Sequence, residues 1–206
     1  MMVHNRLIEP GALEIFCGPM KSGKTLELLH RVEKVRYMND CSYMLFKPAI
    51  DTRDKIIKTR FYSLEADCAT VNEPEEIPQK LPKNCKVVAI DEGQFFRDSL
   101  AEVVLRLLNS DMNVIIAGLD LDFRGEPFGP MPKLLSMANY VKKLTAVCQY
   151  AGCNSPATRS QRLIRGEPAS YFSSLLAVEG SAAEENYESR CLKHHQVPGK
   201  NTLQKL

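Results

Sequence analysis

Hydrophobic positions follow two different spacings over the first 120 residues. Short apolar runs at residues 13–16, 42–46, 86–90 and 114–118 are typical of buried strands. Apolar residues recur every three positions at 26, 29, 32 and 35, which predicts a helix over residues 24–37, and a second helix is expected over residues 100–108. Strands that alternate with helices predict an α/β fold, a parallel sheet flanked by helices.

The pattern changes near residue 144. From there short β-rich pieces with Gly, Pro and Ser replace the alternation of strands and helices. We therefore expect an α/β domain over residues 1–144, a small β-rich domain over residues 145–195, and a flexible polar tail over residues 196–206.

Composition limits the classes of function. The chain has 206 residues, of which 44% are hydrophobic and 25% are charged, as in ordinary folded proteins. Its 27 basic and 25 acidic side chains are too balanced for a protein that mainly neutralises nucleic acid. The seven cysteines fit reduced thiols better than a disulfide framework. Residues 1–10 lack the apolar centre of a signal peptide, so we expect a cytoplasmic protein that does not bind membranes.

A glycine-rich segment with the spacing of a phosphate-binding loop lies between the first predicted strand and the first predicted helix. In such a loop backbone N–H groups surround phosphates, a lysine reaches the outer phosphates and a hydroxyl binds Mg²⁺. The positive end of the following helix adds to the attraction for an anion. The sequence therefore predicts nucleoside triphosphate binding by eight residues: Gly18, Pro19, Met20, Lys21, Ser22, Gly23, Lys24 and Thr25.

Two acids follow the buried run that ends at Ile90. Ligands of open α/β sheets bind beyond the carboxyl ends of the strands, so we expect Asp91 and Glu92 to face the phosphates. Asp91 is suited to hold Mg²⁺, which prefers oxygen ligands. Glu92 remains to orient an attacking hydroxyl and accept its proton, although the spacing alone also allows a solvated loop acid.

Two pairs of metal-ligand residues lie about 40 residues apart in the predicted small domain. Cys148 and Cys153 form one pair, and Cys191 and His194 form the other. Three thiolates and an imidazole fill a tetrahedral zinc site and leave no position for water. We therefore predict a structural zinc ion, with scattered free thiols as the simpler alternative.

Taken together, four ordered motifs resemble those of the zinc-containing type II thymidine kinase family. They are Gly-Pro-Met-x-Ser-Gly-Lys-Thr at 18–25, Lys-Pro-x-x-Asp-Thr-Arg at 47–53, Asp-Glu-Gly-Gln-Phe-Phe at 91–96, and Leu-Asp-x-x-Phe-Arg-x-x-Pro-Phe-Gly at 119–129. The resemblance covers residues 11–195. It implies ATP- and Mg²⁺-dependent phosphorylation of the thymidine 5′-hydroxyl in nucleotide salvage, on a RecA-like P-loop sheet with a zinc-binding lasso domain.

The resemblance also implies roles for individual residues. Glu92 matches the catalytic base, and Arg53 can stabilise charge on the transferring phosphoryl group. Lys24, Thr25, Asp51, Asp91 and Gln94 match residues at the phosphates and the metal ion. The thymidine pocket would include Met20, Leu119, Phe123, Phe128 and Tyr187; without the resemblance, plain core packing would be the simpler reading of the two phenylalanines.

The family is usually tetrameric and inhibited by thymidine triphosphate, so we expect both properties. We also expect deoxyuridine to be a substrate, because no residue is identified that must contact the 5-methyl group. The rival hypothesis from another class is a zinc-containing ATPase that acts on nucleic acid, and a third is a kinase for another nucleoside such as deoxycytidine.

Overall fold

The computed structural model describes residues 8–39, 41–50, 56–58, 65–175 and 185–200. Two predicted site residues, Asp51 and Arg53, lie outside these ranges. Within them, no helix combines the length and the apolar character needed to cross a membrane.

The chain folds into two compact units. The first contains Met1–Cys17, Gly23–Leu119 and Phe128–Lys143. The second contains Leu144–Leu206 together with two short segments from earlier in the chain, Gly18–Ser22 and Asp120–Pro127. Both short segments belong to motifs that were identified in the sequence.

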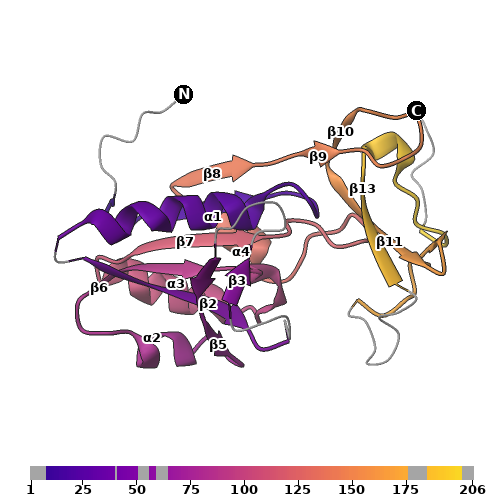
Figure 1. Cartoon of the computed structure of the whole chain (residues 1–206). Helices are drawn as coiled ribbons and strands as arrows, with labels where there is room; N and C mark the ends of the chain where they lie inside the picture. Colours follow the sequence, from indigo (N-terminus) through magenta and orange to yellow (C-terminus); the bar gives the residue numbers. More distant parts are fainter. Residues whose placement is uncertain (1–7, 40, 51–55, 59–64, 176–184, 201–206) are drawn as a thin grey trace. The chain divides into compact units, whose positions relative to one another are not determined.

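The first unit is built on a six-stranded sheet in which all neighbouring strands are parallel (Figure 1). The strand order is β5-β2-β6-β7-β1-β8, so β7 lies between β1 and β6. The strands are β1 (Leu13–Cys17), β2 (Ser42–Pro48), β5 (Ala69–Val71), β6 (Cys85–Ile90), β7 (Asn113–Gly118) and β8 (Tyr140–Lys143). A separate antiparallel pair consists of β3 (Ile56–Lys58) and β4 (Glu65–Asp67).

Helices cover both faces of this sheet. They are α1 (Lys24–Glu33), α2 (Glu76–Lys80), α3 (Leu100–Asn109) and α4 (Met131–Met137), with 3₁₀ turns η1 (Lys34–Tyr37) and η2 (Gly93–Phe95). Buried residues of α1 and η1 pack with one side of the sheet, and those of the other three helices pack with the opposite side (Figure 1). In β7, Val114 and Ile116 join one cluster, and Ile115 and Ala117 join the other. This alternation follows from the two-residue repeat of a strand, and it confirms the predicted parallel sheet flanked by helices.

An ion pair attaches α1 to β1. Glu14 is a charged residue in an otherwise apolar strand, and its carboxylate accepts two hydrogen bonds from the Arg31 guanidinium, at 2.9 and 2.6 Å. A bidentate pair of this kind fixes the relative orientation of its two elements. It thereby holds the helix that begins directly after the phosphate loop.

The predicted elements of the first 120 residues are all present, with small differences in their ends. The helix expected over residues 24–37 is α-helical only to Glu33 and then tightens into η1, as helix ends often do. The short helices α2 and α4 were not predicted. They have five and seven residues and include Pro78 and Pro132, so neither shows a helical repeat of apolar residues.

The second unit is β-rich, as predicted. Its elements are β9 (Ala146–Val147), β10 (Pro156–Ala157), β11 (Arg159–Ile164), β12 (Glu167–Pro168), β13 (Glu185–Arg190) and the 3₁₀ turn η4 (Leu192–His194). Strands β12, β11 and β13 form one antiparallel sheet, and β9 pairs with β10. Its buried apolar cluster consists of Cys148, Ala157 and Cys191, with Ala146 and Cys153 packed against it. Such a small core needs additional cross-links for stability.

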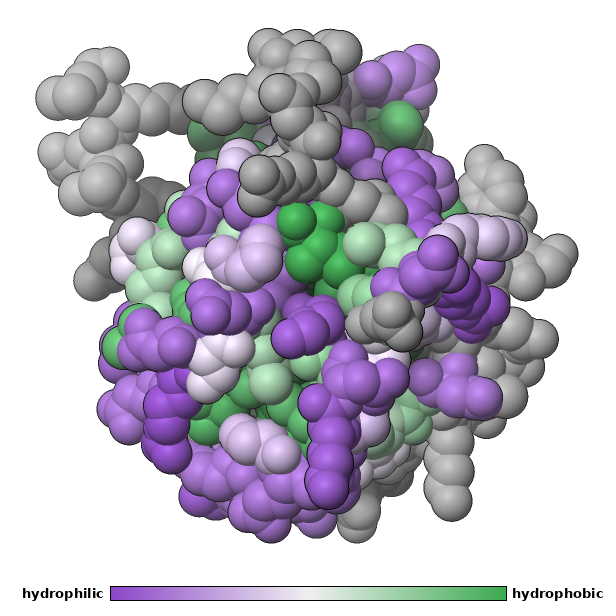
Figure 2. Space-filling model, turned by 90° about the vertical axis from the view of Figure 1, so that its left-hand side faces the viewer, coloured by the Kyte–Doolittle hydropathy of each residue, from purple (hydrophilic) through white to green (hydrophobic). Residues whose placement is uncertain are grey.

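Both hydrophilic and hydrophobic side chains contribute to the surface of the protein. Figure 2 shows one face on which hydrophilic side chains predominate and hydrophobic residues appear in small areas between them. This distribution is normal for a folded protein, whose surface always retains some apolar atoms.

Candidate active site and metal centre

The carboxyl ends of three neighbouring strands meet at one edge of the parallel sheet. Cys17 at the end of β1 pairs with Gly118 at the end of β7, and Ile90 at the end of β6 pairs with Ile116. The segments that follow these strands are the phosphate loop, the acidic pair and the residues that begin at Leu119. This edge is where ligands bind in open parallel sheets.

The phosphate loop has an irregular backbone that ends in a helix. Gly18, Lys21 and Gly23 have φ angles of 140°, 63° and 86°. Helix α1 begins at Lys24, and Glu27 N donates to Gly23 O at 3.0 Å. The hydroxyl oxygen of Ser22 is buried, and within the described part of the chain it has no hydrogen-bond partner. A buried polar atom without a partner fits a ligand oxygen at this loop.

Thr25 and Asp91 bring their oxygen atoms together. The Thr25 hydroxyl donates to the Asp91 carboxylate, with Oγ1 to Oδ2 and Oδ1 distances of 3.0 and 3.3 Å. Burial of Asp91, together with the negative charge of Glu92, raises the Asp91 pKa from 3.8 to about 7, and the charge of Lys24 opposes this shift. A hydroxyl beside a buried carboxylate is a suitable oxygen donor set for Mg²⁺, whose charge would favour the ionised acid.

Glu92 has a backbone conformation that is unusual for a residue other than glycine. Its φ is 53°, directly before η2. A left-handed conformation at such a residue costs on the order of 1 kcal/mol and persists where the surrounding structure fixes it. Strained residues of this kind concentrate at functional sites.

Gln94 holds the side chain of Glu92. Its Nε2 donates to Glu92 Oε2 at 2.6 Å, and its Oε1 accepts from Leu119 N at 2.8 Å. Gln94 is only 1% exposed. A Cβ atom on Gly118 would lie 2.9 Å from Gln94 Oε1, so glycine is needed there for this approach. The structure thus links Glu92, Gln94 and Leu119 directly.

The predicted thymidine-pocket residues fall in both units. Phe128 belongs to the first unit, where its ring packs edge-on against Phe95 with a centroid distance of 5.6 Å. Met20, Phe123 and Tyr187 belong to the second unit. The structure therefore describes their surroundings within each unit separately.

Arg162 connects two of these residues in the second unit. Its guanidinium lies 5.4 Å from the centroid of the Phe123 ring, and the residue pairs with Tyr187 across β11 and β13. A second guanidinium, of Arg124, lies 5.2 Å from the same centroid. Burial raises the pKa of Tyr187, while the nearby charge of Arg162 lowers it to a smaller extent. The Phe123 ring and the Tyr187 phenol therefore both lie close to the positive charge of Arg162.

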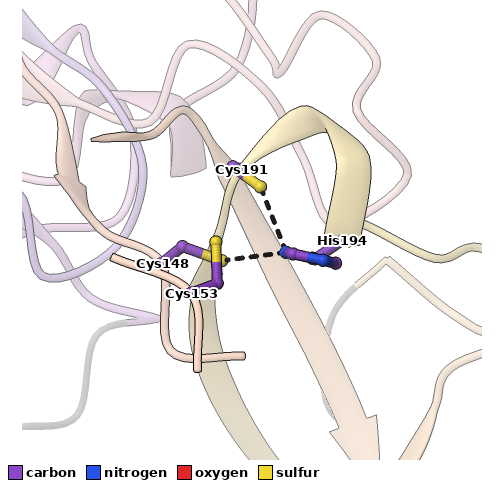
Figure 3. A group of neighbouring side chains, drawn as sticks. All are labelled: Cys148, Cys153, Cys191 and His194. Atoms are coloured by element: carbon purple, nitrogen blue, oxygen red, sulfur yellow. Dashed lines mark hydrogen bonds between the residues drawn. The ribbon is translucent and has the colours of Figure 1, made fainter. Parts of the chain in front are cut away.

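The four predicted metal ligands lie together. Figure 3 shows Cys148, Cys153, Cys191 and His194 pointing toward one another from the turn after β9 and the turn after β13. Their sulfur and nitrogen ligand atoms all lie within 4.8 Å of one another. His194 Nδ1 is 3.3 Å from Cys191 Sγ and 3.7 Å from Cys148 Sγ. Ligands of tetrahedral zinc are about 3.5–3.8 Å apart, so this donor set fits the ion.

The local environment shifts the pKa values of two of these thiols in opposite directions and orients the imidazole. A backbone hydrogen bond from Ser155 is the main cause that lowers the Cys153 pKa to about 6, whereas burial raises the Cys191 pKa. The Tyr150 ring stacks on the His194 ring at a centroid distance of 4.2 Å and so orients the imidazole. The cluster could hold a structural zinc ion.

Sequence reasoning missed several residues that arrange these sites. Ser160 and Arg162 occur in a polar strand, Arg-Ser-Gln-Arg, in which all four side chains are largely buried. Ser189 lies opposite Ser160 in β13. No motif marks them, and only their pairing across two strands shows what they contact.

A protein-family model described as thymidine kinase matches residues 11–195.

Proposed function

This chain belongs to the thymidine kinase family, and we propose that it transfers the γ-phosphoryl group of ATP to the 5′-hydroxyl of thymidine. Family membership establishes an enzyme that phosphorylates thymidine. ATP as the donor, deoxyuridine as a second acceptor and a role in nucleotide salvage belong to our proposal. The observation that carries it is the extent of the family match, which includes the phosphate loop, the acidic pair and the metal-ligand cluster.

In the proposed reaction, the 5′-oxygen of the nucleoside attacks the γ-phosphorus. The bond between this phosphorus and the β–γ bridging oxygen breaks, which yields ADP and thymidine monophosphate. The hydroxyl proton passes to the carboxylate of Glu92. Because the transition state of phosphoryl transfer is loose, positioning and charge stabilisation supply most of the acceleration.

Glu92 is suited to be this base because its carboxylate is held in place. Gln94 fixes Oε2 by a 2.6 Å hydrogen bond, and the peptide N–H of Glu92 donates to Asp91 Oδ1 at 3.0 Å. A general base must lie within hydrogen-bond reach of the proton that it accepts, so a fixed carboxylate favours transfer over a mobile one.

The phosphates are proposed to bind at the loop from Gly18 to Thr25. We assign the outer phosphates to Lys24, and an Mg²⁺ ion to the oxygens of Thr25 and Asp91, with further contacts from Gln94. When bound, Mg²⁺ would neutralise part of the charge that develops on the phosphates. Asp51 and Arg53 keep the roles in phosphate and charge stabilisation that the family resemblance implies.

Nucleoside contacts are proposed for Met20, Leu119, Phe123, Phe128 and Tyr187. What supports them is their match to the family motifs, together with the buried aromatic rings of Phe123 and Phe128. Aromatic rings provide the apolar surface on which a pyrimidine base can pack.

Four further properties stay predictions, two of them from the resemblance and two from the sequence itself. They are a homotetrameric assembly, inhibition by thymidine triphosphate, a structural zinc ion at the Cys148 cluster, and a cytoplasmic location. The cluster geometry supports the zinc assignment, because three sulfur atoms and one nitrogen converge within ligand distance.

The proposed function is tested by incubating the purified chain with Mg²⁺, ATP labelled at the γ-position, and a panel of nucleosides. We expect labelled monophosphates of thymidine and deoxyuridine, and little product from deoxycytidine. If DNA stimulates ATP hydrolysis while no nucleoside is phosphorylated, the nucleic-acid ATPase hypothesis replaces this one.

A further inference from the structure

Two serines face each other across the sheet of the second unit. Ser160 in β11 and Ser189 in β13 are directly paired in the antiparallel register. They are 3% and 1% exposed. Because paired residues of antiparallel strands project to the same side of a sheet, their hydroxyls can act on one common group.

That common group is the backbone of Met20 in the phosphate loop. Met20 N donates to Ser160 Oγ at 3.0 Å, and Ser189 Oγ donates to Met20 O at 2.7 Å. Both polar groups of this residue are therefore held by hydroxyls from neighbouring strands. The Met20 N–H points to a serine and cannot at the same time donate to a phosphate, which leaves that task to other amides of the loop.

The next residue of the loop is held by Gln149, which is hydrogen-bonded to Ser189 in β13. Lys21 Nζ donates to Gln149 Oε1 at 2.9 Å, and the same oxygen accepts from Ser189 N at 2.9 Å. Gln149 N in turn donates to Ser189 O at 2.8 Å. The hydrogen bonds at Met20 and at Lys21 thus converge on one residue, Ser189.

The loop needs such external support because its backbone is strained. Lys21 has a φ of 63°, a conformation that non-glycine residues rarely adopt. Gly18 is packed so closely that a Cβ atom there would lie 2.3 Å from Leu144 O. Strained loops keep one shape only where neighbouring contacts fix them, and a loop that must present several amides to phosphates requires one shape.

We infer that Ser160 and Ser189 are positioning residues for the triphosphate of ATP, because they fix the Met20 peptide groups and thereby the shape of the phosphate loop. This inference rests on the proposed ATP-dependent function. The two serines touch no substrate; they act through the loop backbone. Their loss therefore weakens ATP binding most, and thymidine binding falls to a smaller extent because Met20 is also a proposed nucleoside contact.

The test uses the whole 206-residue chain, loaded with zinc, with alanine and threonine at each position. Ser160→Ala leaves the Met20 N–H without its acceptor, and Ser189→Ala leaves the Met20 carbonyl without its donor. An unsatisfied buried group of this kind lets the loop leave the shape that binds phosphates, so we expect the affinity for ATP to fall about tenfold. Ser160→Thr and Ser189→Thr keep a hydroxyl. Ser170→Ala is the matched control, because the Ser170 hydroxyl accepts from Phe172 N in the same unit.

Two affinities are measured separately by calorimetry: that of a non-hydrolysable ATP analogue with Mg²⁺, and that of thymidine alone. We expect both alanine variants to raise the dissociation constant of the analogue about tenfold and that of thymidine to a clearly smaller extent. The threonine variants should recover most of the affinity, and Ser170→Ala should leave it unchanged. In turnover, KM for ATP should rise while kcat at saturating ATP stays within about threefold.

Equal losses of affinity for both ligands, or an unchanged affinity for the analogue, would overturn the inference and leave the serines with a packing role. If Ser160→Ala does not fold, Ser160→Cys replaces it, since a thiol of similar size is a weaker acceptor and must show the same selective loss. Binding of the analogue by the unmodified protein is measured without any nucleoside. Failure of the proposed kinase reaction would therefore be seen separately from failure of this inference.

Discussion

The side-chain amide of Gln94 lies 2.6 Å from the carboxylate of Glu92, and Gln94 is held in turn by the backbone of Leu119. The proposed base, Glu92, is thus held by Gln94, which follows β6. Gln94 is itself held by Leu119, which follows β7. Two adjacent strand ends determine where its carboxylate points. We therefore expect Gln94 to affect the rate, in addition to the nucleotide contacts proposed for it.

Replacement of Gln94 should slow catalysis. Gln94→Met keeps a similar volume but removes both hydrogen bonds, so the Glu92 carboxylate loses its orientation. We expect kcat to fall about 10- to 100-fold, as small displacements of catalytic groups do, and the affinity for ATP to fall as well, because nucleotide contacts are also proposed for Gln94. Steady-state kinetics and calorimetry measure the two effects. A Gln94→Met enzyme with unchanged kcat would show that Glu92 needs no support from this residue.

The stability of the protein without added Mg²⁺ should depend on the ionisation of Asp91. Its pKa is raised in the folded state to about 7, so between about pH 4 and pH 7 the folded protein binds more protons at this group than the unfolded chain does. The contribution of Asp91 to the free energy of unfolding is therefore lost as the pH rises through this range. Urea unfolding at several pH values measures it.

Asp91→Asn is the control for this pH dependence. The variant should show a flatter profile between about pH 4 and pH 7, and added Mg²⁺ should restore stability to the unmodified protein at pH 7 but not to the variant. Profiles of equal slope in both proteins would assign the pH dependence to other groups.

The metal cluster should hold one zinc ion per chain and stabilise the second unit. Cys191→Ser removes a ligand, so we expect metal analysis to find almost no zinc and the melting temperature to fall. Cys41→Ser is the matched control, because this thiol lies outside the cluster and should leave the zinc content unchanged. The assignment would be wrong if the unmodified, reduced protein contained no zinc and its melting temperature did not rise when zinc was added.

Arg162 should contribute to stability through groups from three segments. Its guanidinium donates to Glu185 at 2.7 Å and to the carbonyl of Ser174, and it also lies over the Phe123 ring. The side chains of Arg162 and Glu185 are 3% and 7% exposed, so Arg162→Ala breaks a buried ion pair and leaves the buried carboxylate without this guanidinium. We expect a loss of about 3–5 kcal/mol in the free energy of unfolding. Urea unfolding provides this value.

The double variant Arg162→Leu with Glu185→Leu separates the charge effect from the packing effect. Replacing both charges also removes the buried carboxylate charge, so part of the lost stability should return. The comparison needs the effect of Glu185→Leu alone on the free energy of unfolding. If the double variant is less stable than Arg162→Ala by this same amount, the two residues do not act as a pair.

Much of the first unit could be predicted because its sequence signals are local. Apolar runs of four or five residues identified β1, β2, β6 and β7, the four strands at the centre of the sheet. The phosphate loop and the Asp91–Glu92 pair stand directly after such strands, so their place at the sheet edge followed from the strand directions. The Cys and His pairs were identified by spacing alone, and the structure brings all four together.

The remaining features depend on contacts between residues that are distant in the sequence. The 2.6 Å contact of Gln94 with Glu92 requires the left-handed turn at Glu92 and the absence of a side chain at Gly118, which no spacing reveals. Ser160 and Ser189 are 29 positions apart and meet only through the register of two strands. The grouping of Gly18–Ser22 with the second unit likewise arises from pairing that is not visible in the sequence.

The central claim is that Glu92 accepts the proton of the nucleoside hydroxyl, and Glu92→Gln tests it most directly. This variant keeps the size of the side chain and removes its basicity. We expect kcat for thymidine to fall about 10²- to 10⁴-fold, while the affinity for the ATP analogue with Mg²⁺ changes less than threefold. A Glu92→Gln enzyme that phosphorylates thymidine at close to the unmodified rate would contradict the account.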